Sequence, residues 1–405
     1  MRTMYEMLPF PVTFQVARLP AIDFGPGAIE RLPEAITHFG QRALLVTGKH
    51  SFQGTPAWFA LQKALHQRHV RWWHQVVADE PSPELVDQAV AEHRAYDIEV
   101  VVGIGGGSTL DAAKAIAGLL RTGTSVMDHL EGVGRGLPWP GPAVSFIAVP
   151  TTAGTGSEAT KNAVLSRRGA DGFKKSFRDE GLVARLALVD PELLASCPQD
   201  LVAANGMDAF TQLLESWVSL RASTFTDGLA ANGLQAFRDG FWAVWQDPAG
   251  APVEARARLA WASLASGITL AQAGLGSVHG LASPLGAFFP IPHGVVCGTL
   301  VAEATRVNIE ALRRRDPNSP ALARYAEAGV VLGNRLYGSP QAAQDGLVEQ
   351  LREWTERLAL PRLSAFGMRE EDIPRVVAHC RGGSMQTNPI HLEDEEVAEI
   401  LYARL

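Results

Sequence analysis

Short apolar runs alternate with helical patterns in the first half of the chain, and this alternation constrains the fold most. The runs occupy residues 43–47 (ALLVT), 99–104 (EVVVGI) and 145–149 (SFIAV). Runs of this length, bounded by Gly or Pro, are typical of buried strands. Helical spacing follows at 83–95, where Ser82 can cap a helix that begins at Pro83, and again at 111–120. The alternation predicts βαβ units and a mainly parallel sheet.

The second half of the chain changes character after about residue 195. Ala, Leu, Arg and Gln dominate residues 201–275, and long helical patterns with few prolines cover 254–273 and 341–358. A chain of 405 residues is long enough for more than one core. We therefore expect an α/β domain over residues 1–195 and a helical domain over residues 196–405.

Charge and cysteine content narrow the function classes. The chain has 36 Lys and Arg against 43 Asp and Glu, a net charge of −7, which argues against a nucleic-acid partner. Cys197, Cys297 and Cys380 lie far apart in the sequence, which suits a reducing compartment and gives no disulfide framework. Residues 1–11 lack the apolar segment of a signal peptide, and no apolar run predicts a membrane span. We expect a cytoplasmic protein that binds neither nucleic acid nor membrane.

A glycine-rich turn follows the second predicted strand and precedes a helical pattern. It contains Gly105, Gly106, Gly107 and Ser108. Glycines let backbone N–H groups approach a phosphate, and the helix N-terminus adds a partial positive charge. Ser108 stands where the G-x-G-x-x-G pattern has its last glycine, so a tight turn capped by Ser108 is the alternative interpretation.

A second polar turn, at residues 150–158, follows the third predicted strand. It carries the hydroxyl groups of Thr151, Thr152 and Thr155. Ligands of α/β sheets bind at the carboxyl ends of the strands, so this turn and the glycine-rich turn predict one binding site. An ordinary loop rich in Thr and Ser remains the alternative.

Candidate metal ligands lie in the second half of the chain. Asp208 and Gln212 are four residues apart and share one face of a helix, and His279 and His293 follow. A carboxylate with two imidazoles can hold Fe(II) or Zn(II). Spacing alone leaves a structural role for either histidine open.

These motifs in this order resemble the iron-containing (group III) alcohol dehydrogenase family, which is related in fold to glycerol dehydrogenase and dehydroquinate synthase. The resemblance covers nearly the whole chain. It rests on 105–108 with Asp111 and Lys114, the turn at 150–158, Lys174, the run 190–193, the run 206–209, His279, His293 and the run 384–389.

The resemblance implies a dehydroquinate synthase-like architecture, with a dinucleotide-binding α/β domain of parallel sheet and an all-helical domain for metal and substrate. It implies an oxidoreductase that interconverts a small alcohol and its aldehyde or ketone by hydride transfer with NAD or NADP, and a homodimer. The implied cofactor-binding residues are Gly48, Gly105, Gly106, Gly107, Ser108, Asp111, Thr151, Thr152, Thr155 and Lys174. The implied catalytic residues are Asp208, His279 and His293, which with Gln212 would hold Fe(II) or Zn(II).

Two departures from the family pattern fall on the metal site. Gln212 replaces the usual ligating histidine, and Ser283 stands where a histidine often relays a proton. An amide oxygen is a weaker ligand than imidazole, so we expect weakened metal binding. Two alternatives are a metal-free reductase of an acidic keto or aldehyde substrate, similar to maleylacetate reductase, and a non-catalytic nucleotide-binding relative.

A third departure concerns the choice of cofactor. Many relatives carry Thr-Asp after the first strand, and that carboxylate favours NAD because it repels a 2′-phosphate. This chain has Thr47-Gly48 followed by Lys49. Gly48 removes the repulsion and Lys49 can attract a phosphate, so the sequence admits NADP. A simple turn at Gly48 is the alternative.

Overall fold

The computed structural model describes residues 13–49, 51–169 and 172–405. The chain divides into two compact units. The α/β unit comprises Ala17–Val202 with Gly240–Ala260, and the helical unit contains Ala203–Asp239 with Trp261–Leu405. The main division therefore falls shortly after the expected boundary at residue 195. Residues 240–260 of the second half, which include the end of one helix and the start of the next, belong to the α/β unit.

The α/β unit is built on a parallel sheet. In the described part of the chain its strands lie in the order β1-β8-β5-β4-β2-β3, and two further strands form an antiparallel pair. The parallel strands are β1 (Ala21–Phe24), β2 (Arg42–Gly48), β3 (Arg71–Val77), β4 (Val100–Gly105), β5 (Ser145–Pro150) and β8 (Leu186–Val189), and the pair is β6 (Asn162–Arg167) with β7 (Phe173–Arg178). The three strands predicted from the sequence are confirmed as β2, β4 and β5.

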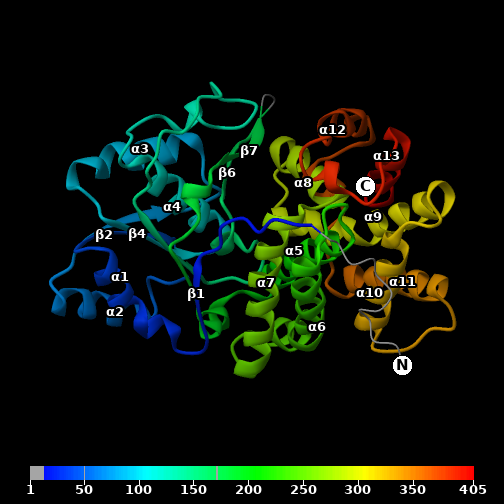
Figure 1. Ribbon diagram of the computed structural model, residues 1–405, viewed down its shortest axis with the longest axis horizontal. Coiled ribbons are helices and arrows are strands. Elements are labelled where there is room, and N and C mark those ends of the chain that lie inside the picture. Colours follow the sequence, from blue (N-terminus) through cyan, green and yellow to red (C-terminus); the bar gives the residue numbers. More distant parts are fainter. Residues whose placement is uncertain (1–12, 50, 170–171) are drawn as a thin grey trace. The chain divides into compact units, whose positions relative to one another are not determined.

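Helices cover both faces of this sheet (Figure 1). Alternate residues of a strand point to opposite faces, and β2 shows this directly. Leu44 and Val46 join the core under α3 (Pro83–His93) and α4 (Gly107–Leu119). Ala43 and Leu45 join the core under α1 (Leu32–Phe39) and α2 (Pro56–Gln67). Strands buried on both faces require continuous apolar runs, which is what the sequence contains.

The connections reverse direction between β2 and β4. From β2 the chain passes through α2 to the edge strand β3, and then through α3 to β4 on the other side of β2. Because α2 and α4 cover opposite faces, the loops after β2 and β4 diverge at the carboxyl edge of the sheet. Ligands of open α/β sheets bind at such a switch point. The fold therefore marks the ends of β2 and β4, at Gly48 and Gly105, as a binding position.

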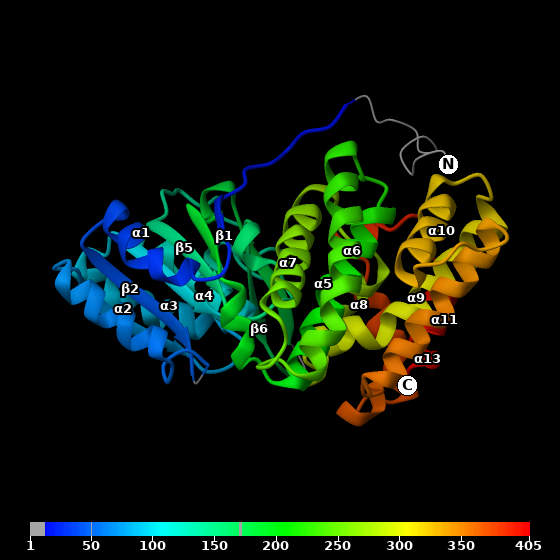
Figure 2. The ribbon, with the colours of Figure 1, turned by 90° about the horizontal axis from the view of Figure 1, so that it is seen from below.

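The helical unit packs around α9, whose middle is almost wholly buried. In this unit α9 contacts α8, α10, α11 and α13 (Figure 2). The helices of the second half are α5 (Gln199–Val218), α6 (Thr224–Gln246), α7 (Val253–Ala273), α8 (Ser277–Phe288), α9 (His293–Arg315), α10 (Pro320–Gly333), α11 (Pro340–Arg357), α12 (Ile373–His379) and α13 (Asp394–Ala403). The helices predicted at 254–273 and 341–358 are confirmed as α7 and α11. None of the helices in the described residues has the length and apolar character needed to cross a membrane.

Candidate active site

The glycine-rich turn lies between β4 and the first turn of α4, as predicted. Gly106 is the N-cap residue of α4, and no side chain caps this end of the helix. The first N–H groups of a helix have no partner within the helix, so an uncapped N-terminus suits an anionic group such as a pyrophosphate. A Cβ atom on Gly107 would lie 2.6 Å from Thr155 Cγ2, so this position has no room for a side chain.

The threonine turn lies directly beside the glycine-rich turn. The backbone N–H of Thr151 donates to the carbonyl oxygen of Gly105 at 3.0 Å. Thr152 Oγ1 lies 3.3 Å from the position of a Cβ atom on Gly106. Thr152 and Thr155 are partly exposed, whereas Thr151 is buried. The structure thus brings the two predicted turns together at the carboxyl ends of β4 and β5.

The loop after β2 forms the other side of the switch point. Thr47 Oγ1 lies 2.9 Å from His74 Nε2, and Gln53 Nε2 donates to Thr47 Oγ1 and to the carbonyl oxygen of Gly48. A Cβ atom on Gly48 would have its closest contact, at 3.5 Å, with Thr109 Oγ1 on α4. Gly48 therefore has ordinary room for a side chain, unlike Gly107.

Asp111 and Lys114 form a largely buried charged pair on α4. We call this pair, together with Ser157, Thr160 and Asn162, the Lys114 cluster. Lys114 Nζ donates to the carbonyl oxygens of Ser157 (2.8 Å) and Asn162 (2.6 Å), and it lies 3.1 Å from both Ser157 Oγ and Thr160 Oγ1. Asp111 accepts from Ser157 Oγ at 2.5 Å and lies 3.7 Å from Lys114 Nζ. These bonds fasten the threonine turn to α4.

The predicted cofactor-binding residues Asp111 and Lys174 have defined partners in the α/β unit, and Glu158 lies near the Lys114 cluster. Asp111, predicted to bind the cofactor, also accepts from the backbone N–H of Val164 at 3.2 Å. Lys174, on β7, pairs with Glu80 at 3.0 Å. Burial raises the pKa of Glu158, which lies near Lys114, to about 7, although Lys114 opposes the shift. Direct contact of Asp111 or Lys174 with a cofactor stays a prediction.

The helical unit contains a second buried cluster, made of Asp208 on α5, His279 on α8, and His293 and Cys297 on α9. We call it the Asp208 cluster. One donor atom from each of the four side chains lies within 4.8 Å of the others. Asp208 Oδ1 is 3.2 Å from His279 Nε2 and 3.7 Å from His293 Nε2. The predicted ligands Asp208, His279 and His293, which are far apart in the sequence, therefore meet in space.

The hydrogen-bond inventory of Asp208 distinguishes this cluster from the Lys114 cluster. Among the described residues, Asp208 is fully buried and its Oδ2 atom has no hydrogen-bond partner. A buried carboxylate oxygen without a donor is costly unless a ligand satisfies it. Carboxylate, imidazole and thiolate are all ligands of divalent cations such as Zn(II). The Asp208 cluster therefore fits a divalent metal ion.

Electrostatics within the cluster favour charged Asp208 and His279 side chains and a neutral Cys297 thiol. Burial alone would raise the pKa of Asp208, but His293 and His279 outweigh burial and the pKa is lowered. Burial alone would lower the pKa of His279, but Cys297 and Glu215 outweigh it and the pKa lies well above its usual value. Burial raises the pKa of the Cys297 thiol to about 12. A bound cation would take the place of these protons, because metal ligands must be deprotonated.

Glu215 orients the His279 ring through a contact with its Nδ1 atom. Its Oε2 atom lies 2.6 Å from His279 Nδ1, and its Oε1 atom accepts from the backbone N–H of Val278 at 2.7 Å. A carboxylate on Nδ1 fixes the tautomer and leaves Nε2 facing the cluster. Glu215 lies seven residues after Asp208 on α5, so both side chains come from one face of that helix.

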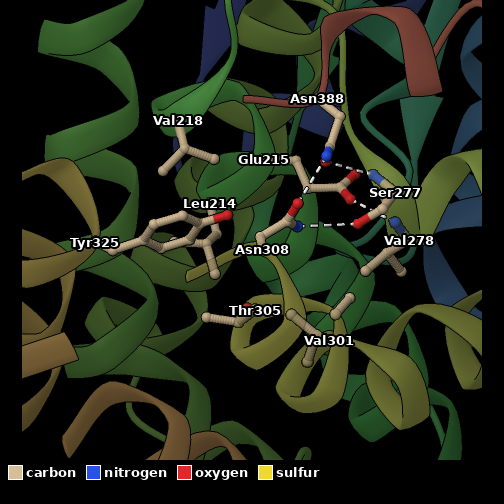
Figure 3. Close-up of a pocket in the computed structure, with 11 residues that line it drawn as sticks. Leu214, Glu215, Val218, Ser277, Val278, Val301, Thr305, Asn308, Tyr325 and Asn388 are labelled. Atoms are coloured by element: carbon tan, nitrogen blue, oxygen red, sulfur yellow. Dashed lines mark hydrogen bonds between the residues drawn. The ribbon is translucent and has the colours of Figure 1, made fainter. Parts of the chain in front are cut away.

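A network of amide side chains holds the start of α8, which carries His279. Figure 3 shows Glu215, Ser277, Asn308 and Asn388 converging beside a small cavity. Asn388 Oδ1 accepts from the backbone N–H of Ser277, and Asn388 Nδ2 donates to Asn308 Oδ1 at 2.7 Å. The sequence run 384–389, part of the family resemblance, therefore serves to anchor α8.

Gln212 lies beside the Asp208 cluster, but its amide is engaged in hydrogen bonds. Its Nε2 atom donates to Asp208 Oδ1 at 3.2 Å, and its Oε1 atom accepts from Ser266 Oγ at 2.6 Å. Ligation by Gln212 stays a prediction. The sequence interpretation missed Cys297 and Glu215. A usable signal for Cys297 was its spacing of four residues from His293 in a helical pattern, which places both on one face.

An uncapped helix N-terminus at the switch point and a buried group of potential metal ligands are together typical of a nucleotide-dependent oxidoreductase of the metal-assisted class. Comparison with known proteins agrees. Residues 20–191 match the model of the iron-containing alcohol dehydrogenases, and residues 202–405 match the C-terminal model of the Fe-containing alcohol dehydrogenase family. The chain belongs to the iron-containing alcohol dehydrogenase family, whose members interconvert alcohols and aldehydes, and the predicted fold and enzyme class are confirmed.

Individual relatives are similar over most of their length. The chain is 33% identical to the 1-propanol dehydrogenase PduQ of Salmonella typhimurium over 334 residues, 80% of this chain and 83% of the relative. It is 28% identical to alcohol dehydrogenase 4 of Saccharomyces cerevisiae, covering 94% and 96%. The structure of a sulfoacetaldehyde reductase from Bifidobacterium kashiwanohense in complex with NAD+ superposes with a TM-score of 0.81 at 26% identity, covering 97% and 99%.

Proposed function

We propose that this protein interconverts short-chain alcohols and aldehydes with NAD(H) or NADP(H), using a divalent metal ion held by the Asp208 cluster. One observation carries the proposal. Asp208 Oδ2 is buried without a partner next to two imidazoles and a thiol, in a chain that also has an uncapped helix N-terminus at its switch point. Such an arrangement has unsatisfied binding capacity for a cation and for an anion.

The substrate class follows from the relatives. Their names refer to 1-propanol, lactaldehyde, 1,3-propanediol and sulfoacetaldehyde, all of which are compounds with short carbon chains. We infer that aldehydes of two to four carbons and their alcohols are the first substrates to test.

The cofactor is proposed to bind the α/β unit. The first N–H groups of α4, at Gly107 and Ser108, would receive the pyrophosphate, and the partly exposed side chains of Thr152 and Thr155 lie beside this turn. The adenosine ribose would lie at the end of β2, where Gly48 presents no carboxylate. An absent carboxylate does not repel a 2′-phosphate, so NADP(H) is proposed as an accepted cofactor alongside NAD(H).

The metal ion is proposed to bind Asp208, His279 and His293 at least. The bound cation supplies Lewis-acid polarisation of the substrate oxygen, and the nicotinamide supplies or accepts the hydride. Glu215 holds the His279 ring so that Nε2 faces the cluster, and Gln212 donates to Asp208. With Ser283 at the usual relay position, the proton is proposed to pass through water or a cofactor hydroxyl rather than through an imidazole.

The oligomeric state and compartment are also proposals. Membership of the family favours a homodimer. Cys197, Cys297 and Cys380 are free and buried in the structure, and free cysteines suit the reducing cytoplasm. Light scattering of the purified chain would test the dimer.

A steady-state assay tests the proposed function. The purified protein is assayed with NADH and NADPH against two- to four-carbon aldehydes, before and after removal of metal by a chelator. We expect aldehyde reduction that is lost with the metal and restored by Zn(II) or Fe(II). Full activity after metal removal would favour the metal-free reductase, and no activity with any pair would favour a non-catalytic nucleotide-binding protein.

A further inference from the structure

The Asp208 cluster contains a fourth donor that replaces the missing imidazole. Cys297 lies one helical turn after His293 on α9, so both side chains project from the same face. Its Sγ atom lies 3.6 Å from His279 Nε2 and 3.9 Å from His293 Nε2, and the residue is fully buried. Its position toward both imidazoles distinguishes it from Cys197 and Cys380, which belong to no group of potential metal ligands in the described residues.

The spacing of the donor atoms matches a tetrahedral zinc site. Typical bonds of about 2.0–2.1 Å to nitrogen and about 2.3 Å to sulfur place tetrahedral N and S donors about 3.6 Å apart. The corresponding distances from Cys297 Sγ are 3.6 and 3.9 Å. Tetrahedral O and N donors lie about 3.3–3.4 Å apart. Asp208 Oδ1 lies 3.2 Å from His279 Nε2 and 3.7 Å from His293 Nε2. One cation can therefore reach all four donors with small side-chain movements, and zinc can expand to five-coordination to take the substrate oxygen as a further ligand.

The hydrogen bonds of Gln212 leave the fourth position to Cys297. Its Nε2 atom donates to Asp208 Oδ1, while its Oε1 atom accepts from Ser266 Oγ. In this orientation the amide holds the Asp208 carboxylate and turns its own oxygen away from the cluster. To ligate, Gln212 would have to give up the bond from Ser266 and reverse its amide.

We propose that the Cys297 thiolate is the fourth metal ligand, which gives an Asp-His-His-Cys set that prefers zinc to iron. The proposal rests on the proposed function, since it concerns the metal site of that reaction. Thiolate ligands favour Zn(II), and affinity for Zn(II) generally exceeds that for Fe(II). Binding replaces the thiol proton by the metal, with release of one proton from Cys297 to solvent and no change of oxidation state.

Cobalt substitution tests the ligand directly. The full-length chain, freed of metal by a chelator, is loaded with Co(II), whose bond to a thiolate produces a charge-transfer absorption band in the near ultraviolet. We expect this band in the unmodified protein and in Gln212→Ala, and its loss in Cys297→Ser. Cys380→Ser is the matched control, because Cys380 is also a buried thiol of the helical unit and should leave the band unchanged.

Affinity and wild-type spectroscopy complete the test. Competition with a chelator should show Zn(II) bound at least tenfold more weakly by Cys297→Ser, with the ratio of Zn(II) to Fe(II) affinity also reduced. X-ray absorption of the zinc-loaded wild type needs no variant and should show one sulfur at about 2.3 Å. A cobalt-loaded protein without the band, a band that survives Cys297→Ser, or a zinc shell of only nitrogen and oxygen would overturn the proposal. If no metal binds at all, the proposed function fails instead.

Discussion

The two buried charged clusters of this protein differ in how completely their polar atoms are satisfied. In the Lys114 cluster the ammonium group has four oxygen partners, and Asp111 accepts from a hydroxyl and from a backbone N–H. In the Asp208 cluster Oδ2 of the carboxylate has none among the described residues, and four donor atoms converge. A satisfied cluster stabilises a fold, whereas an unsatisfied one is typical of a ligand site. This difference alone indicates that the Lys114 cluster stabilises the fold and that the Asp208 cluster binds a ligand.

We expect the largest effect on stability from a substitution that disrupts the Lys114 cluster. Lys114→Met removes the donor that joins α4 to residues 157–162 and leaves the largely buried Asp111 carboxylate without its neighbouring cation. We expect the free energy of unfolding to fall by about 3–5 kcal/mol. Urea denaturation measures it, with Lys161→Met as the control, because Lys161 pairs with Glu180 at the surface and should cost no more than about 1 kcal/mol. Equal losses for the two variants would remove the distinction that we draw.

The second effect is a pH dependence of stability that comes from Glu158, next to the Lys114 cluster. Burial raises the pKa of Glu158 to about 7 from a usual value of 4.5, so the folded state holds a proton that the unfolded state releases earlier. The stability from this group is complete below about pH 4.5 and is lost as the pH rises through 7, a total of about 3 kcal/mol. We expect the stability difference between wild type and Glu158→Gln to change by that amount between pH 4.5 and 8. A constant difference would contradict the assigned pKa.

The third effect concerns metal affinity and tests whether Glu215 positions a ligand of the Asp208 cluster. Glu215→Gln weakens the bond that orients His279, and the loss of such a partner typically lowers metal affinity about 10–100-fold. Chelator competition with Zn(II) measures the affinity. Because Glu215 acts here as a positioning residue, the variant should retain the free energy of unfolding of the metal-free wild type to within about 1 kcal/mol. A large loss of metal-free stability with unchanged affinity would assign Glu215 to the scaffold.

The smallest effect concerns the cofactor end of the α/β unit. A Cβ atom at Gly48 has ordinary van der Waals contacts, so Gly48→Asp can introduce a carboxylate at this position. Repulsion of a 2′-phosphate should lower the ratio of kcat/KM for NADPH over NADH by about tenfold, or 1.4 kcal/mol. Gly48→Asn is the control, since it has the same shape without the charge. An unchanged ratio in the Asp variant would make Gly48 a turn residue only.

The strands that the sequence predicted correctly are those buried on both faces of the sheet. The runs at β2, β4 and β5 are continuous and apolar because helices cover both sides of the sheet. The interpretation did not include β1, β3 and β8. The edge strand β3 is mostly half-buried and mixes Trp, His and Gln, and β1 and β8 have only four residues each, so neither pattern nor length identified them.

In the site, the sequence identified residues but not their contacts. Asp208, His279 and His293 were found through motifs, and the structure brings them together. Cys297 was read only as a sparse cysteine, because nothing in a sequence shows that α8 and α9 place their side chains around one point. Asp111 was predicted to bind the cofactor, and this stays a prediction; in the structure its nearest partners are Ser157 and Val164. Long-range contacts between helices decide these roles. The four-residue spacing of His293 and Cys297 places both on one face of α9, but it does not show which residues of other helices that face meets.

The central claim is that the Asp208 cluster holds the metal ion of a metal-assisted dehydrogenase. Metal content and activity, measured on the same sample, test this claim most directly. Zinc and iron are quantified in the chelator-treated wild type before and after reconstitution, and aldehyde reduction is measured in both states. The account predicts about one metal ion bound per chain on reconstitution, recovery of activity in proportion to occupancy, and neither result in His279→Ala. Undiminished activity in a metal-free wild type, or stoichiometric binding that survives His279→Ala, would contradict it.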